Sequence, residues 1–236
     1  MTFTFHRTLI VFLFFTTSIF ARSSTPLELA SAASRHATLK PSSNTQGPLI
    51  VLDAGHGGTD EGAKVRQLQE KKITLLTALY AKKKLEGLGY RVLLTRIKDT
   101  YISLPKRVSI ANQTNSALFV SIHCNAAQNH LAQGLEIYYC KAGDSVKSLS
   151  SLALADSILN QIIHETGCAS RGIKLGRFHV IRETTMPAIL IEIGFLTNYD
   201  EWASMRKKSY LEQMAKGIAL GVDAYVRSKK SVLGAS

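Results

Sequence analysis

Cysteine is scarce in this sequence of 236 residues: only Cys124, Cys140 and Cys168 are present. A set this small and odd does not make a disulfide framework, so a disulfide-stapled domain is excluded. No internal repeat is visible either. Cys124 directly follows His123 at the end of an apolar run, and alternation along a strand would point the two side chains to opposite faces. We therefore interpret Cys124 as a small buried apolar residue.

Acidic residues are few beside basic ones, 17 against 29, and the formal net charge is +12. Some of the excess lies in basic stretches at 82–84 and 206–208, where a solvated helix face is the simplest explanation. A positive surface also favours an anionic partner, such as cell wall or membrane headgroups. Nucleic acid is disfavoured as a partner, because no nucleic-acid-binding motif accompanies the charge.

Long apolar runs are missing apart from one near the start of the chain. His6 and Arg7 precede a nearly unbroken apolar stretch from Leu9 to Phe15, and Ala21 stands at a plausible cleavage point. This pattern predicts a secretory signal peptide at residues 1–21, and hence a periplasmic or secreted protein. The stretch is shorter than the roughly 20 residues that cross a bilayer. Membrane attachment would therefore come only through an uncleaved signal segment.

The rest of the chain divides into three parts. Residues 22–47 are rich in Ser, Thr, Ala and Pro and predict a linker. Residues 48–228 are one domain's worth of chain, long enough to bury a sizeable core. Residues 229–236 form a short C-terminal tail.

Short apolar runs alternate with helix-period segments along this domain. The predicted strands are Leu49–Leu52, Arg91–Thr95, Leu118–Ile122, Leu135–Tyr139, Phe178–Ile181 and Ala188–Ile193. The predicted helices are Lys71–Leu88, Leu104–Asn115, Leu149–His164 and Tyr210–Val226. Strands interleaved with helices of this length predict an α/β fold: a single domain with a twisted, mainly parallel sheet of about six strands, flanked by helices on both faces.

Four polar residues stand at the edges of the apolar runs: His56, Glu70, His123 and Glu192. Polar groups gather where buried strands end, and the carboxyl ends of the strands are where ligands bind in open α/β sheets. Two neutral imidazoles and one carboxylate suit zinc and leave a coordination position for water. Glu192 is then available as a proton acceptor, and Asp53 could accept a hydrogen bond from a ligating imidazole.

Each of these residues also has a simpler interpretation. A histidine near a strand end is more often a hydrogen-bonded structural residue than a ligand, and Glu70 could merely stabilise the dipole of the helix that it begins. His56 differs in its context because glycines surround it in DAGHGG, which lets the backbone turn sharply. The remaining histidines are interpreted as structural or solvated: His6, His36, His130, His164 and His179.

Six motifs in order along the domain resemble one enzyme family. They are DAGHGG at 53–58, QEK at 69–71, LTR at 94–96, SLxxR at 103–107, FVSIHCNA at 119–126 and PAILIEIGFLTN at 187–198. The series resembles the zinc-dependent N-acetylmuramoyl-L-alanine amidases, cell-wall hydrolases often called type 3 amidases. The resemblance runs from about Leu49 to Tyr225, and the motifs together are highly specific although no single one is.

The resemblance implies one catalytic Zn²⁺ and a peptidoglycan or muropeptide substrate. His56, Glu70 and His123 match the metal ligands of the family, Glu192 matches its catalytic glutamate, and Arg182 resembles a position that faces substrate. The implied reaction cleaves the amide between N-acetylmuramic acid and the L-alanine of the stem peptide, in cell-wall remodelling or cell division.

Two departures from the pattern of some relatives concern access and targeting. Periplasmic relatives that cut septal wall tend to carry a helical insert that covers the zinc until an activator displaces it. Here only about a dozen residues, Cys140 to Ser151, separate one predicted strand from the next predicted helix. We therefore expect an uncovered site and no required activator protein. No separate wall-targeting module is visible, since residues 22–47 are too few to form one.

Three alternatives remain open at this point. The chain could be a non-catalytic, zinc-bearing wall-binding module. It could also be a serine acyl-enzyme of the penicillin-interacting kind, since Ser-x-x-Lys occurs at 103–106 and 204–207. Chance supplies about one or two such tetrads in a chain of this composition, so they carry little weight. Finally, Glu183 or Glu61 could replace Glu192 as the base.

Overall fold

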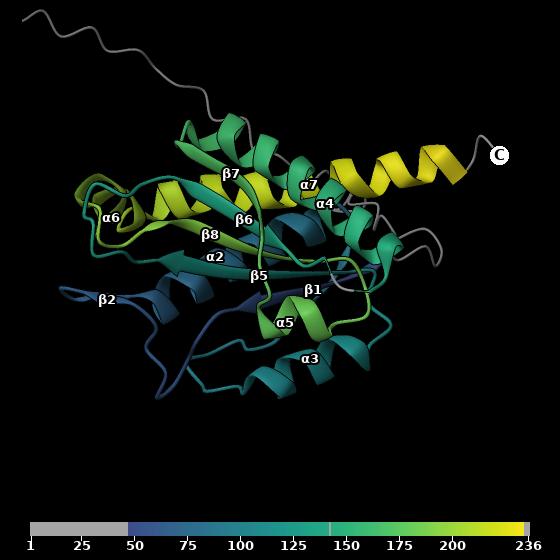
Figure 1. Cartoon of the computed structure of the whole chain (residues 1–236), viewed down its shortest axis with the longest axis horizontal. Coiled ribbons are helices and arrows are strands. Elements are labelled where there is room, and N and C mark those ends of the chain that lie inside the picture. The colour runs from purple at the N-terminus through teal and green to yellow at the C-terminus, as the bar shows by residue number, and fades with distance from the viewer. Residues whose placement is uncertain (1–46, 142, 234–236) are drawn as a thin grey trace, which may run out of the picture. The chain divides into compact units, whose positions relative to one another are not determined.

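The buried apolar strands form one mixed sheet. The computed structural model describes residues 47–141 and 143–233, and within them six strands pair in the order β4-β1-β5-β8-β6-β7 (Figure 1). β4, β1, β5 and β8 are mutually parallel, β6 is antiparallel to β8, and β7 is parallel to β6. The bounds are β1 Leu49–Ala54, β4 Arg91–Leu94, β5 Leu118–Asn125, β6 Leu135–Tyr139, β7 Ser170–Leu175 and β8 Ala188–Phe195. The described residues belong to one compact unit, Thr45–Ser236.

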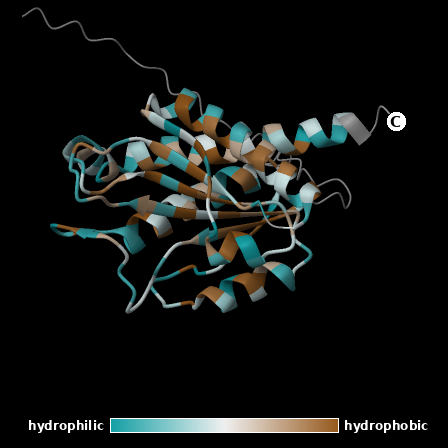
Figure 2. Ribbon diagram, viewed as in Figure 1, coloured by the Kyte–Doolittle hydropathy of each residue, from teal (hydrophilic) through white to brown (hydrophobic). Residues whose placement is uncertain are grey.

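Helices cover both faces of the sheet, because the central strands are apolar on both faces (Figure 2). One face packs against α2 (Glu70–Gly87) and α4 (Ser145–Thr166), and α7 (Lys208–Leu233) packs against both helices. The other face packs against α3 (Leu104–Asn112) and the short α5 (His179–Glu183). These layers confirm the predicted α/β fold. Alternation along β1, β5 and β8 sends Val51, Phe119 and Leu190 to the α3/α5 face, which also carries the functional side chains.

Local sequence signals account for several helix ends. The side chain of Asp144 accepts hydrogen bonds from the backbone N–H groups of Val146 and Lys147, so α4 begins at Ser145, earlier than the predicted Leu149. The side chain of Asn198 starts α6 (Tyr199–Met205), which the periodicity did not predict, in the same way. α7 is longer at both ends than the predicted Tyr210–Val226.

The prediction of a strand at Phe178–Ile181 is wrong. This segment lies in and just before α5, and the sixth strand is instead β7, Ser170–Leu175, which was not predicted. The ammonium group of Lys147 donates hydrogen bonds to the carbonyls of Ile181, Arg182 and Thr184 and so satisfies the end of this helix. A short antiparallel pair, β2 (Lys64–Val65) and β3 (Leu68–Gln69), was also not predicted.

The predicted signal peptide, residues 1–21, lies outside the described residues, as does all of the predicted linker except Gly47. Within the part of the chain that the structure does describe, none of the helices combines the length and apolarity that a membrane span requires.

Helices α4 and α7 cross at very short range because α7 carries glycines at the contact. A Cβ atom on Gly221 would lie 2.4 Å from Cα of Ile158, and one on Gly217 would lie 2.6 Å from Cα of Ile162. Side chains at these positions would push the helices apart. The small residues therefore set the packing of this layer, which buries Ile158 and Ile162 completely.

We expect Gly221→Ala to lower the free energy of unfolding by about 1–3 kcal/mol, because the added methyl group overpacks the α4/α7 contact. Urea denaturation followed by circular dichroism measures the change. Gly87→Ala is the matched control: Gly87 lies in the last turn of α2, and an added Cβ would meet no atom within 4 Å. That variant should keep or slightly raise stability. Equal losses in both variants would contradict the argument.

Candidate metal centre

The loop after β1 presents His56 with its backbone in an unusual conformation. Its φ angle is +60°, in the left-handed region that non-glycine residues rarely adopt and that often marks functional sites. Its Nδ1 lies 2.9 Å from a carboxylate oxygen of Asp60. Nε2 therefore faces the opposite way, 3.0 Å from Oε1 of Glu70. A carboxylate on one ring nitrogen orients the imidazole and selects the nitrogen that is free to bind a ligand.

Two buried arginines hold this loop through its carbonyl groups. Arg107, from α3, donates to the carbonyls of Ala54 (2.7 Å) and His56 (2.8 Å). Arg96, just after β4, donates to the carbonyls of Ala54 (2.9 Å) and Gly55 (2.8 Å). Burial, followed by the charge of Arg107, lowers the pKa of Arg96 to about 10, so the guanidinium stays charged at neutral pH. The motifs LTR and SLxxR thus supply the groups that fix the loop of His56.

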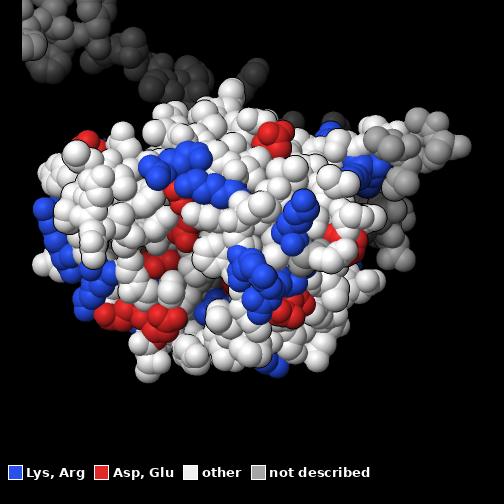
Figure 3. Space-filling model, viewed as in Figure 1, with Lys and Arg blue, Asp and Glu red and all other residues white. Residues whose placement is uncertain are grey.

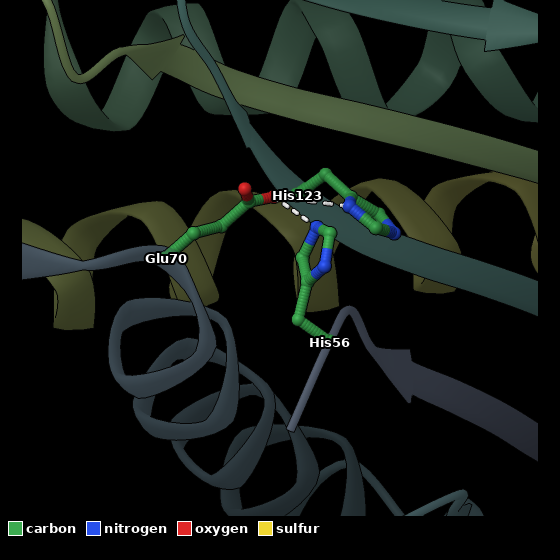
Figure 4. A group of neighbouring side chains, drawn as sticks. All are labelled: His56, Glu70 and His123. Atoms are coloured by element: carbon green, nitrogen blue, oxygen red, sulfur yellow. Dashed lines mark hydrogen bonds and ion pairs between the residues drawn. The ribbon is translucent and has the colours of Figure 1, made fainter. Parts of the chain in front are cut away.

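Glu70 is the first residue of α2 and is 4% exposed. Its Oε1 lies 3.0 Å from both His56 Nε2 and His123 Nδ1 (Figure 4). The same oxygen accepts a hydrogen bond from the backbone N–H of Cys124 at 3.0 Å. Its Oε2 accepts from the backbone N–H of Ala63 at 2.8 Å. Burial alone would raise the pKa of Glu70, but the hydrogen bonds with His123 and His56 outweigh it and hold the pKa well below its usual range.

His123 lies near the carboxyl end of β5, on the α3/α5 face of the sheet. The backbone of Gly55 passes so close that a Cβ atom there would lie 2.3 Å from the imidazole ring. Cys124 points to the opposite face, into the core under α2, which confirms its interpretation as a buried apolar residue. All three cysteines have free thiols.

His56, Glu70 and His123 together form a candidate metal centre. One ligand atom from each lies within 4.8 Å of the other two, although the residues come from three separate elements. Two imidazole nitrogens and one carboxylate oxygen are a donor set that binds divalent metals with one position left open. The His56 and His123 side chains are 24% and 19% exposed, so the group is reachable from solvent.

Glu192 stands directly beside this centre. It lies on β8, and the sheet register pairs it with His123 on β5, so both side chains emerge on the same face. Its Oε2 is buried and has no hydrogen-bond partner among the described residues. Burial, followed by the carboxylates of Glu70 and Glu136, raises the pKa of Glu192 to about 8, with His56 opposing. A half-buried glutamate with one buried, unpartnered oxygen next to a candidate metal site is a typical setting for a general base.

The structure does not give Asp53 the role predicted for it. Its carboxylate accepts hydrogen bonds from Thr95 (2.6 Å), Arg107 (2.7 Å) and Ser121 (2.8 Å), rather than from a ligating imidazole. Burial would raise the pKa of Asp53, but Arg107 and Thr95 lower it overall. Asp60 occupies the predicted position beside His56. Sequence reasoning missed Asp60, and the signal available was an acidic residue four places after His56 in a glycine-rich loop.

Arg182 lies on α5, and its described ion pair is with the neighbouring Glu183 at 2.5 Å rather than with the metal centre. Its helix nevertheless borders the site, because Val180 lines a small cavity of about 70 Å³ together with His56 and His123.

The alternative of a serine acyl-enzyme gains no support from the structure. Lys106 and Lys207 of the two Ser-x-x-Lys tetrads are exposed, whereas a lysine that acts as a base is normally desolvated.

Comparison with known proteins agrees with this geometry. Residues 50–224 match the family model described as N-acetylmuramoyl-L-alanine amidase. The chain belongs to this family. It is 34% identical over 181 residues to the amidase LytC of Bacillus subtilis, an alignment that covers 77% of this chain and 36% of LytC. The chain thus spans only about a third of that relative's length.

Solved structures of other family members superpose on this amidase-family chain. The catalytic domain of CwlV from Bacillus (Paenibacillus) polymyxa has a TM-score of 0.72 and 38% identity, with 77% of this chain and 99% of that domain covered. The CwlD amidase of Clostridioides difficile, solved in complex with the GerS lipoprotein, has a TM-score of 0.72 and 28% identity, covering 77% of this chain and all of that chain.

We expect Asp60→Asn to weaken metal binding by about 10–100-fold, because the carboxylate that orients His56 becomes a neutral amide. Competition with a zinc-binding dye measures the affinity for Zn²⁺. Asp156→Asn, an exposed change on α4, is the matched control and should bind as the unmodified protein does. Unchanged affinity in Asp60→Asn would mean that His56 is oriented without Asp60.

Proposed function

We propose that the protein is a zinc-dependent hydrolase that cleaves the amide bond between N-acetylmuramic acid and the L-alanine of the peptidoglycan stem peptide. The observation that carries this proposal is the convergence of His56, Glu70 and His123, with Glu192 on the adjacent strand. A non-catalytic wall-binding module would need the three ligand residues at most, and it would leave the buried, unpartnered Oε2 of Glu192 without a role.

The residues present fit a resident zinc ion. Nitrogen from two histidines and oxygen from one glutamate match the preference of Zn²⁺, and a catalytic site of this kind keeps a fourth position for water. Zinc bound there would polarise the scissile carbonyl and acidify its water. Asp60 would hold His56 by Nδ1, and the N–H groups of Cys124 and Ala63 would hold the carboxylate of Glu70.

Glu192 would move the proton in this reaction. Its free Oε2 would take a proton from the attacking water and then hand it to the nitrogen of the departing L-alanine. Burial raises the pKa of Glu192, so its carboxyl holds an accepted proton more readily than an ordinary exposed glutamate does until the proton passes to the amine. The neighbouring strands β5 and β6 fix the position of Glu192 on the sheet, and its Oε2 is buried between them and the site.

Arg182 would contribute to substrate binding from the rim of the site. α5 brings it near the small cavity beside His56 and His123, and Lys147 fixes this helix to α4 through the α5 carbonyls. The guanidinium would exchange its ion pair with Glu183 for a contact with a polar group of the substrate.

We assign the protein to the periplasm or the secreted fraction, since its proposed substrate lies outside the cytoplasm and its N-terminal pattern predicts export. Its role there would be cell-wall remodelling or cell division.

We expect Glu192→Gln to keep its zinc and to lose at least a hundredfold in activity, because an amide cannot accept the proton. The assay is mass spectrometry of fragments released from purified peptidoglycan, and metal analysis of the same sample checks the zinc. A chelator should abolish the release of stem peptides by the unmodified protein.

Glu183→Gln is the matched control for this prediction. Glu183 is an exposed glutamate on α5 whose charge pairs with Arg182, so its loss should leave most of the activity. Full turnover in Glu192→Gln together with a dead Glu183→Gln would move the base to Glu183. No free stem peptides from any variant would leave only a wall-binding module.

We also propose that no activator protein is required. β6 ends at Tyr139 and α4 begins at Ser145, and this separation in sequence is too short for a covering helical insert. CwlD was solved with a lipoprotein partner, so the need for a partner within the family must be tested for each protein. The purified protein alone should release stem peptides from isolated wall, and activity only after addition of a second protein would contradict this.

A further inference from the structure

Beside the metal centre, a buried carboxylate is surrounded by two cations that the proposed chemistry does not use. Glu136 on β6 is 2% exposed. Its Oε1 accepts from Nε of Arg171 and Nζ of Lys174, each at 2.5 Å, and its Oε2 accepts from the hydroxyl of Tyr138 at 2.7 Å and the amide of Asn125 at 3.1 Å. Both cations come from β7, the strand that the sequence did not predict.

A bulge in β7 brings the two cations to the same face. Residues three apart on a regular strand point to opposite faces. Here Leu135 pairs with Ser170 and Ile137 with Ile173, so β7 fits one more residue than β6 into the same length. The extra residue is accommodated at Gly172, whose φ of +78° is costly for other residues. Bulges often re-aim a side chain next to a functional site, and this one turns Arg171 toward Lys174 and Glu136.

This cluster adjoins the proposed general base. Glu136 on β6 is paired directly with Glu192 on β8, so the two carboxylates share a face of the sheet. Arg171 also lies over the ring of Phe195, 5.3 Å from its centre, at the end of the strand that carries Glu192. β7 lies two strand spacings from β8, roughly 10 Å between backbones, and the long side chains of both cations reach back across part of this distance to Glu136 on the intervening strand.

Arg171 and Lys174 keep part of their side chains open to solvent although both pair with Glu136, and Arg171 also interacts with the carboxylate of Glu201. The two side chains are 44% and 34% exposed. On the face drawn in Figure 3, basic side chains gather over β6 and β7, with acidic atoms directly beside them. A buried carboxylate holds both cations rigidly from below and leaves their solvent side free to receive an anion.

We propose that Arg171 and Lys174 form a subsite for a free carboxylate on the stem peptide, at the residue that follows the L-alanine. This inference rests on the proposed function. In the proposed reaction the leaving amine takes its proton from Glu192, and each further residue can carry the peptide about 3.5 Å away from it. The side chains of Arg171 and Lys174 reach back from β7 to Glu136, and Arg171 also lies over Phe195 of β8, so a peptide that runs along this edge would meet them. The subsite would orient the peptide half of the substrate and select acidic over amidated stem peptides.

Two synthetic muropeptides that differ only at this position, one with a carboxylate and one with a carboxamide, test the subsite. We expect the unmodified protein to favour the carboxylate by about tenfold in kcat/KM, mostly through KM, the size of effect expected for one charge-assisted contact. Lys174→Met should bring the ratio close to one. Lys83→Met, an exposed lysine on α2 far along the chain from the cluster, removes the same charge and should keep the tenfold preference.

A second pair of variants separates substrate binding from the structural role of the cations. Glu136→Gln frees both cations, so the preference should persist or increase. Glu136→Gln combined with Lys174→Met keeps the local charge balanced yet should still lose most of the preference. If Lys174 only neutralised Glu136, Lys174→Met would slow both substrates equally and the double variant would restore both.

The outcomes distinguish this inference from the function on which it rests. Equal kcat/KM values for both muropeptides with the unmodified protein would overturn the subsite while leaving the amidase activity intact. A preference that survives in Lys174→Met and in the double variant would overturn it too. Failure to cleave either muropeptide or intact wall would instead overturn the proposed function, and the subsite with it.

Discussion

A single carboxylate oxygen, Oε1 of Glu70, is the point on which the site depends. It lies within hydrogen-bond distance of His56, His123 and the backbone of Cys124, and so it joins the first turn of α2 to two neighbouring strands. Each partner comes from a segment that is remote in sequence, so the oxygen collects its contacts only when the sheet and α2 are in place. Because the three side chains already converge, they would hold a divalent metal ion with little rearrangement.

That convergence in turn requires polar groups to be buried beside the core. The carboxylate of Asp53 and the guanidinium of Arg107 are both buried and lie 2.7 Å apart, and Thr95 and Ser121 complete the hydrogen bonds of the carboxylate. A buried pair of this kind is not necessarily a net source of stability, but loss of one partner would leave an uncompensated charge at a cost of about 3–5 kcal/mol. Its role here is to hold the loop that presents His56.

The sequence predicted the parts of the site that follow from strand ends and missed the parts that follow from loops and irregular strands. His56 and His123 were recognisable because each follows a nearly continuous apolar run. Asp60 was not, since its contact with His56 depends on a left-handed backbone that no periodicity encodes. β7 was not predicted because the bulge at Gly172 breaks its alternation and none of its residues is fully buried. The composition of residues 178–181 predicts a strand, yet the segment leads into α5, whose last carbonyls accept hydrogen bonds from Lys147 of α4, and a contact so remote in sequence leaves no local signal.

The position of β7 at the end of the sheet order gives its bulge a second consequence. An outermost strand exposes a row of unpaired backbone groups that can recruit another chain and start aggregation. Irregular pairing and lysine or arginine side chains are two of the devices by which natural proteins block such recruitment. Gly172 supplies the first device, and Arg171 and Lys174 supply the second. Straightening this strand would therefore cost the protein some of its solubility as well as the arrangement of its cations.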